Sequence, residues 1–428
     1  MFLLLVLFLD YSPNTLVPPP FKHSFGFYRA SKYYLQLFLG PGYDYDDPQG
    51  IAAAKLKELD DPDTKKDDDE LSVFAINSGR GQIVYNVGLE AVKTYGGKKV
   101  FSNPKGITVN EDGLIAVADY DNKRVVKLQY TEGKIEEVGE ILISGRPFDV
   151  CFDSHNNLYV TDYDNSCVRV FDATDTPLLQ FGTEGRALGE ISQPMGIEVI
   201  DADAPHNHYN DDFIVITDKE GLRLSKFSKT GRFIGSIQNT DIGLPDARML
   251  YVAIDYFGSI YVTDEINDQI HKFDHGLHYI ISVGRRGTSK GEFVAPRGIS
   301  IWRKYGQVLL SEREGGQYLW IGADAFVVGC FPERFTGEQP GTTLAIYITQ
   351  DSKLAITLHN SLGEKVRDLV LGIQREPGEF LIVWDGLDNN GQLVPPGEYH
   401  FNILVKSLHG LSRRLEKTLE VGVECTAF

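Results

Sequence analysis

The sequence predicts an all-β chain: a six-bladed β-propeller followed by a small β-sandwich. One observation is a repeated segment between residues 31 and 330, in which short strands alternate with tight turns and helical periodicity is absent. A second is composition, because 11% aromatic residues, 43 Gly and only 3 Met favour strands and turns over helices. A third is the stretch after residue 331, which alternates apolar and polar residues in short segments.

The clearest copy of the repeat is residues 103–130, NPKGITVNEDGLIAVADYDNKRVVKLQY, which reads as three strands separated by two turns. A second copy follows at residues 146–172. Two landmarks run through all copies, a proline that opens the first strand and an acid that ends the second. With their substitutes they lie at Pro48, Pro104, Pro147, Pro194, Met249 and Pro296, and at Asn77, Asp119, Asp162, Asp218, Asp264 and Glu312.

Neighbouring acids or their substitutes are 42, 43, 56, 46 and 48 residues apart. Three to four strands at this period are typical of propeller blades. The motifs Pro-x-Gly-Ile, Tyr-Val-Thr-Asp at Tyr159 and Tyr261, and Asn-x-x-Val/Ile at Asn165 and Asn267 resemble the NHL repeat. The resemblance covers roughly residues 31–330 and implies a six-bladed propeller.

The chain begins with nine uncharged apolar residues before Asp10, too few to span a bilayer. Residues 1–20 fit a truncated signal peptide with a linker; the alternatives are a misassigned start or a buried strand. In the propeller, residues 21–330, Tyr33–Leu39 is predicted to be an outer strand. It would pair beside Gln317–Gly322, complete the sixth blade and close the ring.

The repeated acids Asp119, Asp162, Asp218 and Asp264 are predicted to be structural, because an Asp that ends a strand accepts hydrogen bonds from turn amides. Asn122, Asn165 and Asn267 suit a left-handed position in the same turn. The alternative is a ring of carboxylates that binds a cation or a basic ligand.

Two insertions, residues 57–70 and 201–212, lie between first and second strands and should emerge opposite these turns. The first is strongly acidic but lacks the glycine and terminal Glu of a twelve-residue calcium loop. The second carries His206 and His208, an H-x-H pair that would need further metal ligands. Solvated loops explain both insertions, so we predict no cofactor, with calcium as the alternative.

Binding residues are expected where copies differ, in the second-strand turns of the first, fourth and sixth blades. These turns place Arg80, Arg223 and Arg313 on one face, where they would form a positive funnel for an acidic group. The alternative is that they pair with neighbouring acids such as Glu220 and Glu314.

Residues 331–428 are predicted to form the sandwich. Leu354–His359, Trp384-Asp385-Gly386 and Pro396-Gly397-Glu398-Tyr399 resemble the Ig-like domain of the flagellar hook-capping protein family. Trp384 would fill its core, and residues 388–391 (Asp-Asn-Asn-Gly) would make a tight hairpin. The four cysteines do not indicate a disulfide scaffold, although Cys330 and Cys425 are candidates for a bridge.

A net charge of −18 argues against nucleic-acid binding. The first hypothesis is a monomeric, secreted or envelope-associated bacterial protein. Its propeller would bind a protein, peptide or glycan, and its Ig-like domain would serve for spacing or attachment. The alternative is a lyase or hydrolase of the gluconolactonase-like or peptidyl-amidating-lyase-like kind, which the resemblance would give an axial metal. Only Glu198, Asp149 and Asp255 supply acid at or beside the inner strands, and hydrolase motifs are absent, so an enzyme is the weaker hypothesis.

Overall fold

The computed structural model describes residues 14–19, 29–59, 71–88, 91–219, 222–336, 341–409 and 415–426. The chain divides into two compact units. The propeller unit is Phe21–Trp320; the C-terminal unit is Ile321–Phe428 together with Met1–Pro20. The division falls before the predicted boundary at residue 330. The apolar start of the predicted signal segment and most of the acidic insertion lie outside the described residues.

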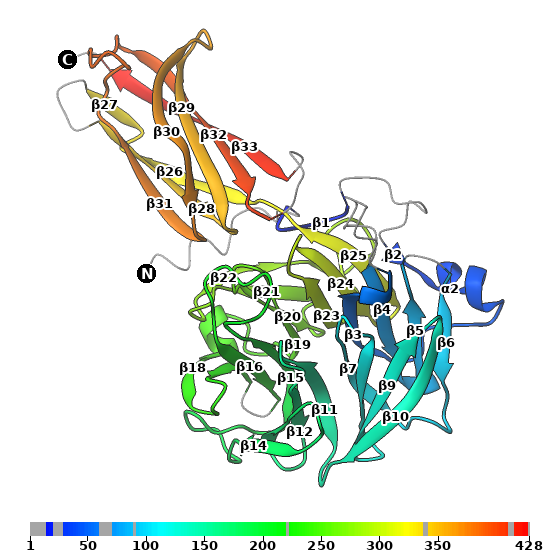
Figure 1. Cartoon of the computed structure of the whole chain (residues 1–428). Helices are drawn as coiled ribbons and strands as arrows, with labels where there is room; N and C mark the ends of the chain where they lie inside the picture. Colours follow the sequence, from blue (N-terminus) through cyan, green and yellow to red (C-terminus); the bar gives the residue numbers. More distant parts are fainter. Residues whose placement is uncertain are drawn as a thin grey trace. The chain divides into compact units, whose positions relative to one another are not determined.

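Six antiparallel sheets make up the described part of the propeller unit (Figure 1). Five of them have four strands each, in chain order. They are β3 (Pro48–Lys55), β4 (Leu71–Asn77), β5 (Gln82–Asn86) and β6 (Lys93–Gly96); β7 (Pro104–Val109), β8 (Leu114–Asp119), β9 (Arg124–Thr131) and β10 (Lys134–Leu142); β11 (Pro147–Phe152), β12 (Leu158–Asp162), β13 (Cys167–Phe171) and β14 (Pro177–Phe181); β15 (Pro194–Ile200), β16 (Phe213–Asp218), β17 (Arg223–Phe227) and β18 (Phe233–Gln238); β19 (Met249–Ile254), β20 (Ile260–Asp264), β21 (Gln269–Phe273) and β22 (Tyr279–Val283).

The sixth sheet contains β23 (Pro296–Trp302), β24 (Gln307–Glu312) and β25 (Gly315–Ile321), and β2 (Arg29–Ala30) pairs with β25. Arg29 faces Gln317 and Ala30 faces Gly316. The segment that pairs beside Gln317 is thus Arg29–Ala30, whereas the sequence predicts Tyr33–Leu39 in this place. Short 3-10 turns lie at η1 (Lys57–Leu59), η2 (Ser78–Arg80) and η3 (Asn239–Ile242).

The predicted strand Tyr33–Leu39 is wrong, because these residues form the helix α2 (Lys32–Leu39). The Ser31 side chain caps the helix start by accepting from the Tyr34 amide. Gly40 ends it with a φ of 94°, and its amide donates to the Gln36 carbonyl. The residues that lengthen the sixth sheet are thus Arg29 and Ala30, just before the helix.

The first strands of the six sheets are neighbours in chain order, and the last one, β23, lies against the first, β3 (Figure 1). One hydrogen bond repeats between successive sheets. The hydroxyl before the second-strand acid donates to a carbonyl of the next sheet, from Thr161 to Met195 (2.8 Å) and from Thr217 to Leu250 (2.6 Å). Ser311 makes the same bond from the sixth sheet to Gln49 of the first.

The glycines of the Pro-x-Gly motif allow this close approach. A Cβ on Gly106 would lie 2.6 Å from the Cα of Asp149 in the next sheet. A Cβ on Gly298 would lie 2.7 Å from the Cα of Gly50, which belongs to the first sheet. A side chain at either position would push neighbouring sheets apart.

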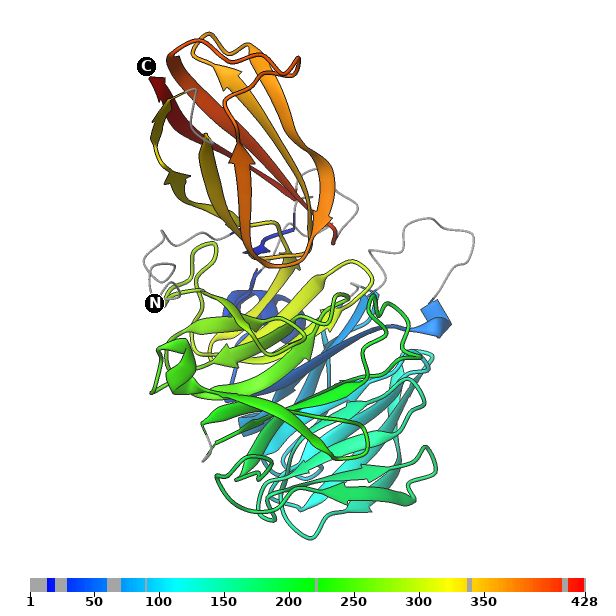
Figure 2. The same cartoon turned by 90° about the vertical axis from the view of Figure 1, so that its left-hand side faces the viewer.

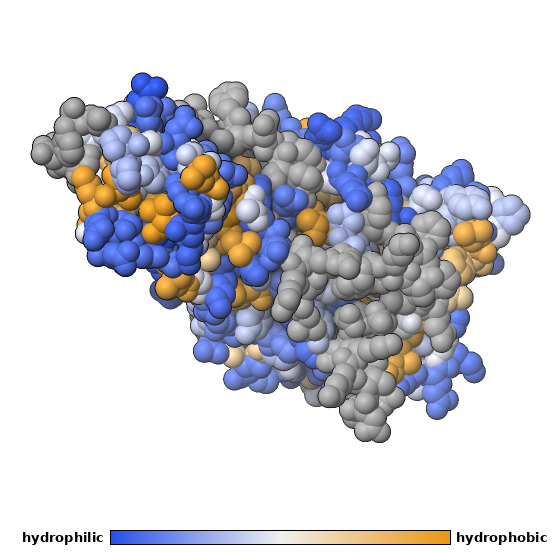
Figure 3. Space-filling view, turned by 90° about the horizontal axis from the view of Figure 1, so that it is seen from above, coloured by the Kyte–Doolittle hydropathy of each residue, from blue (hydrophilic) through white to orange (hydrophobic). Residues whose placement is uncertain are grey.

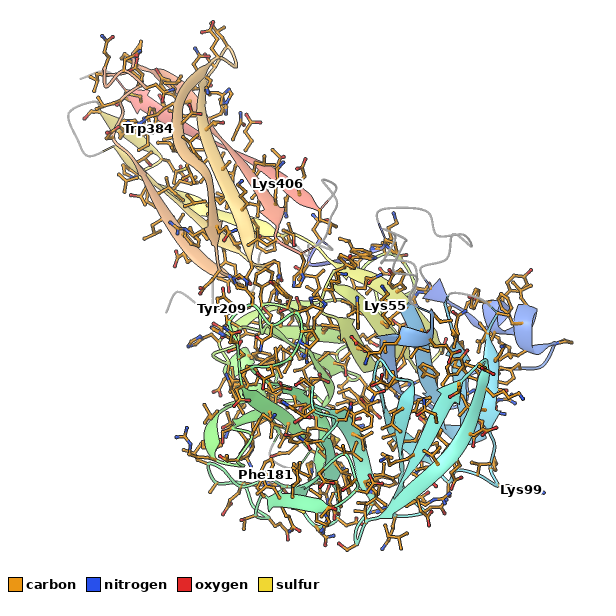
Figure 4. All side chains as sticks on the ribbon, viewed as in Figure 1. Lys55, Lys99, Phe181, Tyr209, Trp384 and Lys406 are labelled. Carbon is orange, nitrogen blue, oxygen red and sulfur yellow. The ribbon has the colours of Figure 1, made fainter. Side chains whose placement is uncertain are left out.

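The C-terminal unit is a two-layer β-sandwich (Figure 2). One layer contains β26 (Ala325–Phe331), β28 (Thr342–Ile348) and β31 (Gly378–Trp384). The other contains β27 (Arg334–Thr336), β33 (Glu416–Thr426), β32 (Gly397–Ser407), β29 (Ser352–Asn360) and β30 (Lys365–Arg375). Trp384 is fully buried in the core, as predicted, and its indole N–H donates to the Leu387 carbonyl (Figure 4). Asp388 accepts from the amides of Asn390 and Gln392 in the predicted hairpin.

Residues 14–19 belong to the same unit as the sandwich. The Gly322 amide donates to the Thr15 carbonyl at 2.9 Å, next to β1 (Leu16–Val17), and Thr15 and Leu16 are buried. Cys330 and Cys425 both lie in the sandwich core as free thiols, so the candidate bridge is not formed.

Apolar patches interrupt the polar surface of this unit (Figure 3). Its exposed apolar side chains include Phe331, Leu371, Leu381 and Val383. Among the helices that the structure describes, none is both long and apolar enough to cross a bilayer.

Candidate functional site: an axial cavity

A cavity of about 380 Å³ lies where the first strands of all six sheets meet. It is lined along these strands and at their C-terminal ends, which is the side of the two insertions. The first half of the second insertion, up to His206, forms part of the lining. Cavities of this size are typical of small-molecule sites in proteins.

The inner end of the cavity is formed where two repeats depart from the Pro-x-Gly motif. Asp149 and Tyr251 stand where the other four repeats have glycine, and both are buried. The Tyr251 hydroxyl donates to the Gln49 side chain at 3.1 Å, and its ring packs against Phe148 at 5.6 Å. These side chains fill the axis on the side of the second-strand turns.

Glu198 and Arg303 form an ion pair inside the cavity. Glu198 lies on β15, and Arg303 follows β23 in the sixth sheet. The Arg303 Nη2 donates to Glu198 Oε1 at 2.8 Å and to the Val199 carbonyl at 2.9 Å, while Nε donates to the Ile254 carbonyl at 3.1 Å. One guanidinium thus connects the fourth, fifth and sixth sheets.

Burial sets the protonation of the acids at the axis. It raises the pKa of Glu198 to about 7, against the opposing charge and hydrogen bond of Arg303. It also raises the pKa of Asp149 well above its usual range, although the Ile197 amide donates to this carboxyl at 3.1 Å. Burial therefore favours the protonated form of both carboxyls.

The rim of the cavity is aromatic on one side and polar on the other. Trp302 and His206 lie edge to face with 6.3 Å between ring centroids. The Trp302 indole N–H is buried and has no hydrogen-bond partner among the described residues. On the polar side, the Asn110 side-chain amide donates to the Asn156 side-chain oxygen at 2.8 Å. This hydrogen bond joins the second and third sheets.

His206 and His208 have different neighbours. His206 packs at the cavity rim, whereas His208 packs among Tyr209, Tyr256 and Phe257. The described residues do contain another group that could hold a metal, His155, Asp201 and Asp203, whose donor atoms lie within 4.8 Å of one another. Asp201 already accepts from the amide and the hydroxyl of Ser154, so this group reads as part of a turn.

The axial residues do not fit the metal of a propeller lyase or hydrolase. A guanidinium already neutralises Glu198, and burial raises the pKa of Asp149. Asp255, the third acid that the sequence indicates, binds the amides of Phe257 and Ser259 in its own turn. Burial also raises the pKa of the Cys151 thiol in the cavity wall well above its usual range, which keeps it protonated and non-nucleophilic.

The repeated acids lie away from this cavity, in buried turns, and each pairs with a cationic or imidazole side chain. Asp119 accepts from the Ser102 amide at 2.7 Å and from Arg124 at 2.9 Å. The other pairs are Asp162 with Arg169, Asp218 with Arg223, Asp264 with His271, and Glu312 with Arg29. Burial opposes ionisation of Asp264, but hydrogen bonds from His271 and Asn267 lower its pKa to about 2.

The sequence predicts the left-handed backbone position at the asparagines, but the structure has it one residue later. Asn122, Asn165 and Asn267 donate their side-chain amides to the acid three residues earlier, at 2.8, 2.8 and 2.6 Å. The residue after each of them has the positive φ: Lys123, Ser166 and Asp268. Asparagine is therefore placed there as a donor rather than for its backbone freedom.

The three predicted funnel arginines are differently placed. Arg223 is buried, and its guanidinium donates to Asp218 and to carbonyls of residues 185–190, so it does not face solvent. Arg80 donates to the Asp44 carbonyl and stacks on Tyr43. Arg313 is exposed. Their role in binding stays a prediction, and the structure does not bring Arg223 to a common mouth with the other two.

Sequence reasoning missed Arg303, Trp302 and Tyr251. Tyr251 carries a signal, because it replaces the motif glycine just as Asp149 does. Arg303 and Trp302 come at or after the end of β23, where the repeats share no landmark, and only the packing of the sheets against one another brings them to the cavity.

Known families match two parts of the chain. The NHL repeat matches residues 101–128 and 145–171, and the FlgD Ig-like domain matches residues 333–407. The chain therefore contains NHL repeats and a C-terminal FlgD Ig-like domain, which confirms the predicted resemblances.

Solved structures with a similar backbone fold are propeller proteins. Virginiamycin B lyase from Staphylococcus aureus is 17% identical with a TM-score of 0.43, over 59% of this chain and 77% of that chain. A gluconolactonase from Xanthomonas campestris is 10% identical with a TM-score of 0.46, over 73% and 99%. PorZ, described as a bacterial surface component of the type-IX secretion system of Porphyromonas gingivalis, is 11% identical with a TM-score of 0.48, over 93% and 54%.

Proposed function

We propose that this chain, which carries NHL repeats and a FlgD Ig-like domain, is an extracytoplasmic bacterial binding protein. Its six sheets are the blades of one closed propeller, and its axial cavity takes a small polar ligand or one polar group of a peptide or glycan. The Ig-like domain serves for spacing or attachment. The observation that carries the proposal is that Asp149 and Tyr251, which break the repeat, meet Glu198 and Arg303 in a single cavity.

Closure of the ring rests on contacts of the sixth sheet with the first. Ser311 repeats the hydroxyl-to-carbonyl bond by which earlier sheets contact their successors, and Gly298 packs against Gly50. In addition, the Ser300 hydroxyl accepts from the Ala53 amide at 3.2 Å, and Arg297 donates to the Pro48 carbonyl at 2.9 Å.

Binding is favoured over catalysis by the state of the reactive groups. The thiol of Cys151 is protonated, and Glu198 is held by a guanidinium. The Ser154 hydroxyl in the lining lies 3.3 Å from His155 Nδ1, but it donates its proton to Asp201, so the imidazole is not placed to activate it as a nucleophile. The arrangement orients a ligand and offers it charge and hydrogen bonds.

A cavity-filling variant tests the proposal. Thr108 is half-buried in the cavity wall, so Thr108→Phe should occupy the ligand's space. We expect at least one of putrescine, 1,4-butanediol, succinate and N-acetylglucosamine to raise the unfolding midpoint of the unchanged protein and not that of the variant. A ligand at a hundred times its Kd stabilises by about 2.7 kcal/mol.

The matched control is Thr357→Phe on β29 of the C-terminal unit, also half-buried and remote from the cavity in the chain. It should keep the full ligand response. Failure of all four compounds to stabilise the unchanged protein, or equal stabilisation of Thr108→Phe, would contradict the proposal.

A further inference from the structure

The cavity is unevenly charged. Its described lining contains six acidic residues, Glu111, Asp112, Asp149, Asp153, Glu198 and Asp201, and two basic ones, Lys57 and Arg303. Of the six acids, Asp149 has its pKa raised by burial and Asp153 pairs with Lys229 at 2.9 Å. Lys57 is exposed and pairs with Asp112 at 2.8 Å, so its charge is already neutralised at the rim. A cleft lined by one sign of charge attracts ligands of the opposite sign.

One oxygen in the cavity is left without a protein donor. Arg303 binds Glu198 through Oε1, and no described residue donates to Oε2. Arg303 itself is anchored by the carbonyls of Val199 and Ile254, so it holds Glu198 in place from one side. The free oxygen suits a ligand N–H, because N⁺–H···O⁻ hydrogen bonds are about twice as strong as neutral ones.

The aromatic rim fits the same kind of ligand. Trp302 lines the cavity, and tryptophan has the aromatic face to which cations bind best. Asp201 and Asp153 also line the cavity, but both carboxyls already accept hydrogen bonds from neighbouring turn residues. Glu198 therefore supplies the acceptor for a ligand N–H.

We infer that the axial cavity takes a small organic cation, a primary amine or a guanidinium, whose N–H groups bind the free oxygen of Glu198 and whose carbon chain lies against Trp302. The inference rests on the proposed ligand role of the cavity and names its ligand class. The same chemistry is shared by a free diamine and by a lysine or arginine side chain of a peptide.

The test is calorimetric titration at pH 8 with putrescine, its neutral isostere 1,4-butanediol and the dianion succinate. Putrescine should bind with one site per chain, and butanediol at least tenfold more weakly, since a charge-assisted hydrogen bond contributes about 1.5 to 3 kcal/mol. Succinate should give no heat of binding. A lysine amide and an acetylated lysine-containing tripeptide distinguish a free amine from a peptide side chain.

Glu198→Gln keeps the shape of the side chain and removes its charge, so it should weaken putrescine binding by about tenfold or more. The control is Glu398→Gln, an exposed acid of the C-terminal unit, which should bind as the unchanged protein does. If Glu198→Gln fails to fold, Trp302→Leu is the second variant, with a smaller loss expected.

Equal binding of putrescine by Glu198→Gln, or equal affinity for butanediol, would overturn the inference. Butanediol or N-acetylglucosamine binding that Thr108→Phe abolishes, without putrescine binding, would overturn the ligand class while leaving the proposed function standing. Absence of binding by every compound would overturn both.

Discussion

At the scale of the residue, each repeated acid pairs with a cationic or imidazole side chain, and the sequence position of that partner differs from blade to blade. Arg124 and Arg223 come five residues after their acid, Arg169 and His271 seven, and Glu312 receives Arg29 from the N-terminal segment. In the first blade the acid is replaced by Asn77, whose side chain accepts from the Asp46 amide and donates to the Asp44 carbonyl. In the first blade, therefore, the position of the acid is uncharged and its described partners are backbone groups instead of a cation.

Asp162→Ala should lower the free energy of unfolding by on the order of 1–3 kcal/mol, because Arg169 and the Asn165 amides lose a buried acceptor. Ligand binding at the axis should be unchanged. Asp121→Ala removes an exposed acid from the equivalent turn of the second blade and should cost little. Chemical denaturation measures both variants, and full stability with lost binding would return the repeated acids to a binding role.

Glu198 should make stability depend on pH. Its pKa is raised from 4.5 to about 7, so the fold holds a proton that the unfolded chain releases earlier. Stability contributed by this group is therefore present at pH 4.5 and lost as the pH rises to about 7, on the order of 3 kcal/mol. Glu198→Gln cannot titrate, so it should gain stability relative to the unchanged protein between pH 5 and 8.

Urea denaturation of both proteins at pH 5 and pH 8 measures this difference. The pKa of Glu312 is also raised to about 7, but Glu312 is present in both proteins and cancels in the comparison. Parallel stability curves for the two proteins would show that Glu198 titrates normally.

At the scale of the element, comparison between copies of the repeat located the strands within the sheets, but it assigned a strand wrongly to residues 33–39. The Pro and Asp landmarks located the strands because the same close approaches and turn hydrogen bonds recur in each copy. Residues 33–39 matched an outer strand in position and apolar content, yet Ser31 and Gly40 supply helix caps. Local capping decided the element, and two residues before it, Arg29 and Ala30, took the strand's place.

Arg29→Gln should loosen the sixth blade. Arg29 donates to Glu312 at 2.6 Å and to the Glu292 carbonyl at 2.8 Å, so the change leaves a buried carboxyl without its cation and frees β2. Hydrogen exchange should accelerate in β25 and stay unchanged in β9. Arg285→Gln, which removes an exposed arginine near the same blade, should leave both strands protected. Equal exchange in β25 for the two variants would mean that Arg29 does not hold this blade.

At the scale of the whole molecule, the sequence predicted a propeller and an Ig-like domain, and it placed Glu198, Asp149 and Asp255 at or beside the inner strands without predicting a cavity there. It could not predict which side of the axis is open, because that depends on Tyr251 and Phe148 meeting across blades that are far apart in the chain. Arg303 reaches Glu198 over 105 residues of sequence. Such contacts follow from the packing of separate sheets rather than from any local sequence pattern.

The most direct test of the axial cavity as the ligand site is crystallographic. Crystals grown with 4-bromobenzylamine, an organic cation that carries an anomalous scatterer, should show a bromine peak inside the cavity near Trp302, with the ammonium group at Glu198. The peak should be absent from crystals of Thr108→Phe. A bromine peak only on the side of the second-strand turns or on the outer surface, with the cavity empty, would contradict the account.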